Sequence, residues 1–93
     1  MREVLLFYLP SCPHCQKALR LQEALRNAHP EYRDIPLRLV DESREVDFAN
    51  AHDYYYVPTY YVGEEKVHEG IVDAAIVESV FQRAQKELPS DPV

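Results

Sequence analysis

The chain is short and acidic: it has 93 residues, of which 46% are hydrophobic and 28% are charged, and its formal net charge is −6. This length allows one domain core, and the composition is that of a compact soluble domain rather than a disordered chain. The ten Lys and Arg residues lie among acidic neighbours, so no basic face is available to bind nucleic acid.

The first predicted element is a buried strand. Glu3 to Leu9 is an unbroken run of β-favouring and apolar residues that ends at Pro10, which predicts a central strand covered on both faces. Pro13 suits the first turn of a helix, and apolar residues then recur at helical spacing until Pro30. We therefore expect a helix over residues 13 to 28.

A second strand and a second helix are predicted next. A loop through residues 30 to 34 leads into the short strand Leu37 to Val40. Ser43 is then placed to cap a helix that carries the apolar side chains of Val46, Phe48 and Ala49. The order to this point is strand, helix, strand, helix.

The last third of the chain predicts a hairpin and a helix. Thr59 to Val62 and Lys66 to Glu69 are short strand candidates joined by the tight turn Gly63-Glu64-Glu65, so they should be antiparallel. Asp73 is placed to cap a final helix, which Pro89 ends. One apolar stripe of this helix contains Ile76, Val77, Val80, Phe81, Ala84 and Leu88.

The whole order, βαβαββα, predicts one α/β domain in which three helices flank a four-stranded mixed sheet. No linker or internal repeat divides the chain. We therefore expect a single domain over residues 1 to 88, followed by a short C-terminal tail over residues 89 to 93.

Two cysteines, Cys12 and Cys15, lie where the first strand gives way to the first helix. Free backbone N–H groups and the positive end of the helix dipole stabilise a thiolate there, which lowers the pKa of Cys12 below the free value of about 8.5. Cys15 lies one turn further along the same face, within reach of a disulfide with Cys12, and points toward the interior. This arrangement predicts that Cys12 attacks a substrate disulfide and that Cys15 resolves the mixed disulfide.

The two residues between the cysteines are expected to tune this chemistry. Pro13 starts the helix, and His14 lies in the same first turn as Cys12. An imidazole at this position stabilises the thiolate but has no charge to stabilise in the disulfide. We therefore expect His14 to raise the reduction potential of the pair.

The segment Phe7-Tyr8-Leu9-Pro10-Ser11-Cys12-Pro13-His14-Cys15 resembles the active-site segment of glutaredoxins, and Val57-Pro58-Thr59 resembles a second motif of the thioredoxin superfamily. The resemblance spans roughly residues 3 to 88 and implies a thioredoxin fold. It also implies that Pro58 is held cis beside the cysteines. Val57, Pro58 and Thr59 are then expected to bind the substrate, with the Val57 backbone pairing with an extended chain.

The chain matches neither branch of this superfamily completely. Thioredoxins resemble it less, because their Trp before the motif is Ser11 here and the buried acid of their central strand is Leu6. Glutaredoxins usually carry a Lys where Leu9 stands and a Gly-Gly segment that residues 69 to 73 match poorly. Because those groups hold glutathione in glutaredoxins, we expect glutathione to be a poor electron donor.

These features predict an enzyme, a glutaredoxin-like or thioredoxin-like thiol–disulfide oxidoreductase that reduces disulfides in protein substrates. It is expected to need no cofactor beyond the Cys12–Cys15 redox-active disulfide, with thioredoxin reductase or glutathione as the electron donor. The rival hypothesis is a non-enzymatic redox sensor or zinc-binding module that uses the same pair. A closed zinc site needs two further ligands, and the four histidines show no paired spacing that supplies them.

Several aromatic residues have two possible roles. The three tyrosines at positions 54 to 56 precede Val57, and packing is favoured over the alternative of a substrate-binding rim. Tyr60 and Tyr61 should face opposite sides of the sheet. Three histidines are expected to be solvated surface residues: His29, His52 and His68.

The longest apolar run near the start of the chain, Val4 to Leu9, is far shorter than the ~20 residues that a membrane-spanning helix needs. No small-residue cleavage site follows it, so no export signal is expected. We therefore expect a cytoplasmic protein that contacts no membrane and acts as a monomer.

Overall fold

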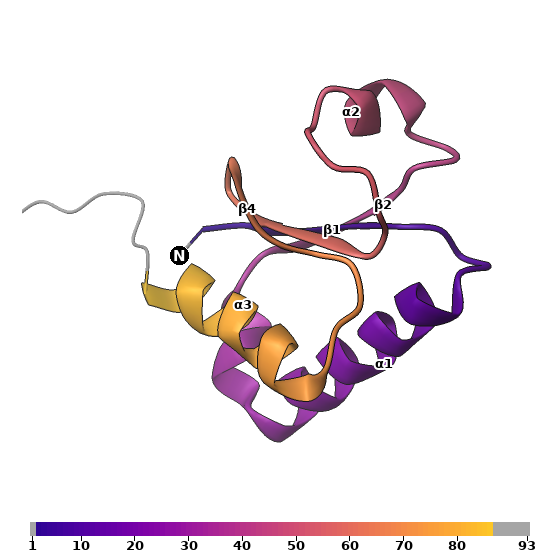
Figure 1. The fold of residues 1–93 in the computed structure, drawn as a ribbon. Helices are drawn as coiled ribbons and strands as arrows, with labels where there is room; N and C mark the ends of the chain where they lie inside the picture. The colour runs from indigo at the N-terminus through magenta and orange to yellow at the C-terminus, as the bar shows by residue number, and fades with distance from the viewer. Residues whose placement is uncertain (1, 87–93) are drawn as a thin grey trace, which may run out of the picture.

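A four-stranded mixed sheet with helices on both faces forms the centre of the structure, a computed structural model that describes residues 2–86 (Figure 1). The strands lie in the order β2-β1-β3-β4. The central strand β1 pairs in parallel with β2 and antiparallel with β3, and β3 pairs antiparallel with β4. Their bounds are Val4–Tyr8 for β1, Leu37–Asp41 for β2, Thr59–Val62 for β3 and Glu65–Glu69 for β4.

The helices divide unequally between the two faces. In Figure 1, α1, α3 and the 3₁₀ helix η1 lie on one side of the sheet, and α2 lies on the other. Each helix within residues 2–86 is too short or too polar to cross a membrane. Their bounds are Pro13–Ala28 for α1, Pro30–Asp34 for η1, Val46–Asn50 for α2 and Ala74–Lys86 for α3.

This architecture confirms the predicted order βαβαββα and the α/β fold class. The central strand is shorter than predicted: it spans Val4–Tyr8, all of which pairs with β2, and the residues from Val4 to Phe7 pair with β3 as well. The first helix has its predicted bounds, because Pro13 starts it and the turn at His29–Pro30 ends it. Leu88, Pro89 and the predicted tail over residues 89 to 93 lie outside the described residues.

Alternation along β1 separates two hydrophobic clusters, one on each face of the sheet. Tyr60 and Tyr61 confirm the prediction that they face opposite sides, since each belongs to a different cluster. The large cluster, under α1 and α3, contains Val4, Leu6, Ala18, Tyr32, Ile35, Tyr60, Val62, Val72, Val77, Val80, Phe81 and Ala84. The small cluster, under α2, contains Leu5, Phe7, Val40, Ala49 and Tyr61.

One buried polar pair joins α1 to the sheet. The hydroxyl of Tyr60 donates to Gln22 Oε1 at 2.7 Å, and both side chains are almost completely buried. A buried hydroxyl or amide without a partner costs about 1–3 kcal/mol, so this bond is what allows both groups to lie in the large cluster. It also fixes the face of α1 that meets β3.

Two local predictions are wrong. Ser43 does not cap α2: its hydroxyl donates to Asp41 Oδ1 at 2.6 Å, and α2 begins only after Glu45. The Asp41 carboxylate, two residues before Ser43, competes with the helix start for the Ser43 hydroxyl. It also accepts the backbone N–H of Ser43 at 3.0 Å. Residues 30 to 34, predicted as a loop, form the helix η1, because Pro30 starts a helical turn and Tyr32 packs into the large cluster.

The hairpin and the last helix are close to prediction. The loop between β3 and β4 has two residues, Gly63 and Glu64, so β4 starts at Glu65 rather than Lys66. Gly63 has a φ of +61°, a left-handed value that favours glycine at the first position of a two-residue hairpin loop. Asp73 caps α3 as predicted: its Oδ1 accepts the backbone N–H of Ile76 at 2.8 Å.

Candidate functional site

The loop between β1 and α1 holds the two cysteines. Cys12 is the N-cap of α1, with extended backbone angles of φ −80° and ψ 121°, and Pro13 follows as the first helical residue. The backbone N–H of Cys12 donates to the carbonyl of Leu9 at 3.1 Å, which closes a tight turn. The side chain of Gln16 donates to the Pro10 carbonyl at 3.0 Å and ties the helix back to this turn.

The two thiols differ in accessibility. Both cysteines are free in the structure; Cys12 is half-buried, whereas Cys15 has an exposed fraction of 0%. Cys15 shares the inward face of α1 with Ala18 and Gln22, the other buried residues of that helix. A substrate disulfide can therefore reach Cys12 from solvent, whereas Cys15 is shielded from it.

The start of α1 lowers the pKa of Cys12. The largest cause is the backbone N–H of Cys15, followed among the favourable contacts by the Cys15 thiol and the backbone N–H of His14, while partial burial opposes them. Unpaired N–H groups at a helix start stabilise an anion in this way. The backbone N–H of His14 is among these causes, and the effect of its imidazole on Cys12 stays a prediction.

Burial has the opposite effect on the second cysteine and raises the pKa of Cys15 to about 12. The backbone N–H of Leu9 opposes this rise, whereas the hydrogen bond with Cys12 and the negative charges of Cys12 and Glu42 add to it. At neutral pH the proton therefore remains on Cys15, and Cys12 is the thiol of the pair that ionises more readily. The pair is arranged as one accessible nucleophile beside one protected thiol.

The predicted substrate-binding residues lie at the same end of the sheet as the cysteines. Thr59 is paired with Phe7, so Pro58 lies beside the end of β1 that leads to Cys12. The Val57–Pro58 peptide bond is cis. Pro58 and Thr59 are buried and Val57 is half-buried, and the Pro58 carbonyl accepts the N–H of Gly70 at 2.8 Å.

The three tyrosines before Val57 do not behave alike. Tyr54 packs against Phe7, with ring centroids 4.8 Å apart, and its hydroxyl donates to Glu42 at 2.7 Å. Tyr55 and Tyr56 are 88% and 70% exposed, so the prediction that they pack is wrong.

A strand residue far along the chain explains this exposure. Glu69 Oε2, on β4, accepts the backbone N–H of Tyr55 at 2.5 Å and of Tyr56 at 2.8 Å. Lys66 pairs with the other oxygen of the same carboxylate at 2.8 Å. The backbone of this segment is thus fastened to β4, and its two rings remain in solvent.

His52 is a site-adjacent residue that sequence analysis missed. Its ring lies 4.7 Å from that of Phe7, 4.8 Å from Phe48 and 5.0 Å from Tyr61, and its Nδ1 is 2.9 Å from the Phe48 carbonyl. The prediction of a solvated surface residue is therefore wrong for His52. The signal was the helical spacing of four residues between Phe48 and His52, which places them on one face.

The other predicted surface histidines keep partial exposure. His29 has a side chain that is 45% exposed and lies 3.6 Å from the carboxylate of Glu31. His68 is half-buried, with its Nε2 2.8 Å from the carbonyl of Ile71. Within the part of the chain that the structure describes, no group of three or more His, Cys, Asp or Glu residues is placed to hold a metal ion.

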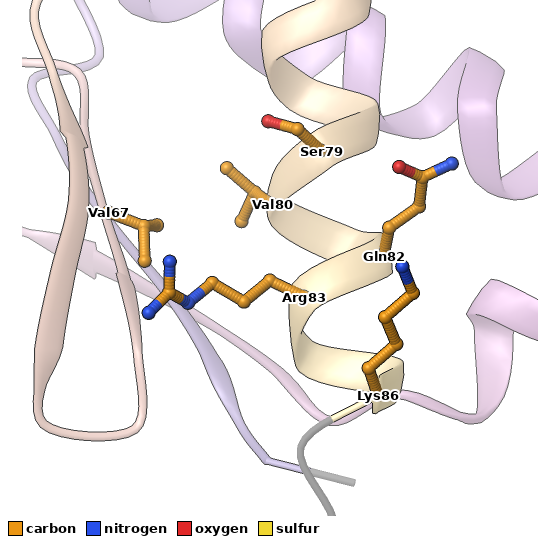
Figure 2. Close-up of a pocket in the computed structure, with 6 residues that line it drawn as sticks. All are labelled: Val67, Ser79, Val80, Gln82, Arg83 and Lys86. Atoms are coloured by element: carbon orange, nitrogen blue, oxygen red, sulfur yellow. The ribbon is translucent and has the colours of Figure 1, made fainter.

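A cavity of about 420 Å³ lies between α3 and β4 at the far end of the sheet (Figure 2). Arg83 reaches from α3 toward Val67 and pairs with Glu65 at 2.6 Å. Glu65 is paired across the hairpin with Val62, which faces Val4 at the start of β1, so this cavity is separate from the cysteines. Its lining residues are Val67, Ser79, Val80, Gln82, Arg83 and Lys86.

The fold matches known structures, although no protein-family model and no curated protein matches the sequence. A mutant thioredoxin from Halobacterium salinarum superposes with a TM-score of 0.68 at 22% identity, covering 94% of this chain and 77% of that one. A thioredoxin-like protein from Clostridium perfringens gives 0.65 at 18% identity, covering 90% and 71%. Thioredoxin O2 from Arabidopsis thaliana, in its oxidised state, gives 0.60 at 23% identity, covering 92% and 76%. At these identities the similarity establishes a shared fold.

Proposed function

We propose that this chain, which has the thioredoxin fold, is a thiol–disulfide oxidoreductase acting on protein disulfides through Cys12 and Cys15. The observation that carries the proposal is the contrast between the two thiols. Cys12 is accessible and its pKa is lowered, whereas Cys15 is buried one turn away and its pKa is raised. A helix start that stabilises one thiolate beside a second thiol is suited to disulfide exchange.

The proposed reaction has two exchange steps. The Cys12 thiolate attacks one sulfur of the substrate disulfide, so a mixed disulfide forms and the other substrate sulfur leaves and takes a proton. Cys15 then loses its proton as it attacks the Cys12 sulfur, which releases the second substrate thiol and forms the Cys12–Cys15 disulfide. Each cycle moves two electrons to the substrate, and a thiol donor must return them.

Supporting roles are proposed for five further residues. Pro13 and His14 tune Cys12, since Pro13 begins the helix whose backbone N–H groups face the sulfur. Val57, Pro58 and Thr59 bind the substrate chain, because they lie at the end of the sheet where β1 leads to Cys12. The donor is thioredoxin reductase or glutathione, with glutathione expected to be the poorer one because Leu9 offers it no charge. The cytoplasmic location also stays a prediction.

Trapping the mixed disulfide tests the roles of the two cysteines. We expect Cys15→Ser to attack a disulfide substrate such as insulin and then stop as a covalent adduct, visible on a non-reducing gel. Cys12→Ser should form no adduct, because the buried Cys15 is protonated and inaccessible. Equal trapping by both variants would contradict this assignment.

The electron donor and the rival hypothesis are tested with the wild-type protein. Insulin reduction is followed with thioredoxin reductase or with glutathione and its reductase, and activity with neither favours the redox sensor. Tightly held zinc, at about one ion per reduced chain, would show that the thiols are ligands rather than nucleophiles.

A further inference from the structure

A cavity of about 350 Å³ lies on the α2 face of the sheet. Its lining brings together a carboxylate, two phenol rings, an imidazole and an amide. The residues are Glu42, Ala49, Asn50, His52, Tyr54 and Tyr55. Most of these groups accept hydrogen bonds or present aromatic rings, a chemistry that suits a cationic guest.

The cavity lies at the cysteine end of the sheet. Glu42 directly follows β2, and its backbone N–H donates at 3.1 Å to the carbonyl of Tyr8, the last residue of β1. From Tyr8 the chain continues to Cys12, and from Tyr55 it continues to Val57. The Glu42 charge also contributes to the raised pKa of Cys15, which agrees with this placement.

The Glu42 carboxylate has capacity for a second partner. The Tyr54 hydroxyl donates to Oε1 at 2.7 Å, and an ionised carboxylate offers about four lone-pair sites in all. Tyr55, on the rim of the cavity, is 88% exposed, so the faces of its ring are open to solvent. A carboxylate beside an open aromatic ring attracts an ammonium or guanidinium group through both charge and the ring quadrupole.

The charge of this half of the molecule points to the same kind of guest. Residues 41 to 78 contain ten acidic and two basic residues, whereas residues 1 to 40 contain four acidic and six basic residues. The acidic segment, residues 41 to 78, includes α2, the exposed tyrosines and the hairpin of β3 and β4. A surface of one sign steers partners of the opposite sign and excludes partners of its own sign.

We propose that this cavity receives a lysine or arginine side chain of the substrate protein, next to the disulfide that Cys12 attacks. The inference rests on the proposed function and adds a substrate class to it: disulfides with a basic residue nearby. Glu42 binds the cation, Tyr55 covers it, and the neighbouring carboxylates attract the basic segment from solution.

The test compares two peptides that each contain one intramolecular disulfide and differ only by Arg or Gln a few residues from one cysteine. Pre-reduced protein is mixed in excess with each peptide, so that each peptide molecule reacts once. The protein concentration is kept low enough that little peptide is bound before reaction, and the observed rate constant divided by the protein concentration then gives the second-order rate constant. We expect the Arg peptide to react about three- to tenfold faster at low salt, with the preference shrinking as salt is added. Equal rates for the two peptides would overturn the inference.

Variants then locate the preference. Glu42→Gln should bring the Arg-to-Gln ratio close to one, and Tyr55→Ser should lower it part of the way. The matched control is Glu23→Gln, which removes the same charge from an exposed position on α1, about two turns after Cys15 and outside the cavity. It should keep the wild-type ratio, apart from the small loss that the change in net charge produces.

Two other outcomes are informative. If Glu42→Gln slows both peptides equally, Glu42 acts through Cys15 rather than through the cavity, and the inference is wrong. If wild-type protein reduces neither peptide, the proposed oxidoreductase function fails and the inference falls with it; a ratio of one with measurable rates overturns the inference alone.

Discussion

Cys12 and Cys15 are three positions apart, yet their surroundings give the two thiols opposite properties. The sequence predicts this contrast in outline, because a CxxC pair at the junction of a strand and a helix places one thiol at the helix start and the other inward. Two contributions lie beyond sequence reasoning: the Leu9 backbone N–H near Cys15 and the charge of Glu42. Both depend on how the turn after β1 and the end of β2 meet.

Alkylation separates the two thiols and tests the role of His14. At neutral pH, iodoacetamide should modify Cys12 and leave Cys15 intact, because the pKa of Cys15 is raised to about 12. His14→Ala keeps the backbone N–H but removes the imidazole that is proposed to stabilise the thiolate, so the pH at which Cys12 becomes reactive should rise. The measurement is peptide mapping by mass spectrometry across a pH series. An unchanged pH in the variant would show that the imidazole does not tune Cys12.

Elements with long or regular patterns are predictable, and elements held by distant residues are not. The run before Pro10, the stripe of α3 and the hairpin at Gly63 follow from local sequence alone. The helix α2 has only five residues, too few for a periodic pattern, so the sequence does not locate its start after Glu45. Tyr55 is exposed because Glu69, fourteen positions away, holds its backbone, and no local pattern carries that contact.

The contact between Glu69 and the tyrosine segment predicts a pH dependence. Lys66, followed by the backbone N–H groups of Tyr55 and Tyr56, lowers the pKa of Glu69 from 4.5 to about 2. A carboxyl whose pKa is lower in the folded than in the unfolded state stabilises the fold fully at any pH above its unfolded-state pKa. For Glu69 this contribution is lost as the pH falls from 4.5 through about 2. Wild-type stability to urea should therefore decline over this range.

Glu69→Gln should show a smaller decline over the same range, because its side chain does not titrate. Glu64→Gln, on the exposed hairpin turn, is the matched control and should behave like the wild type. An equal decline in wild type and Glu69→Gln would show that this carboxylate does not stabilise the segment.

The two faces of the sheet are covered unequally: the face under α1 and α3 is the thick side of the molecule, and the face under α2 is the thin side. The large cluster joins α1, α3 and η1 to the sheet, whereas the small cluster is covered by α2 and the segment that follows it (Figure 1). The cysteines start the helix on the thick side, and the cavity of Glu42 and Tyr55 lies on the thin side. Proposed chemistry and proposed recognition therefore belong to opposite faces of one sheet, and they meet at the end where β1 and β2 finish.

The thin side has a consequence for local opening. A five-residue helix without a side-chain cap, over a small cluster, has little to keep its hydrogen bonds closed, so its amide hydrogens should exchange with deuterium faster than those of β1 and α1. Because Ala49 and Asn50 of α2 line the cavity, a basic peptide bound there should slow this exchange selectively. Hydrogen exchange with mass spectrometry measures both effects, and uniform protection across the chain would contradict them. The element whose hydrogen bonds open most readily, α2, is then the element that a bound basic peptide stabilises.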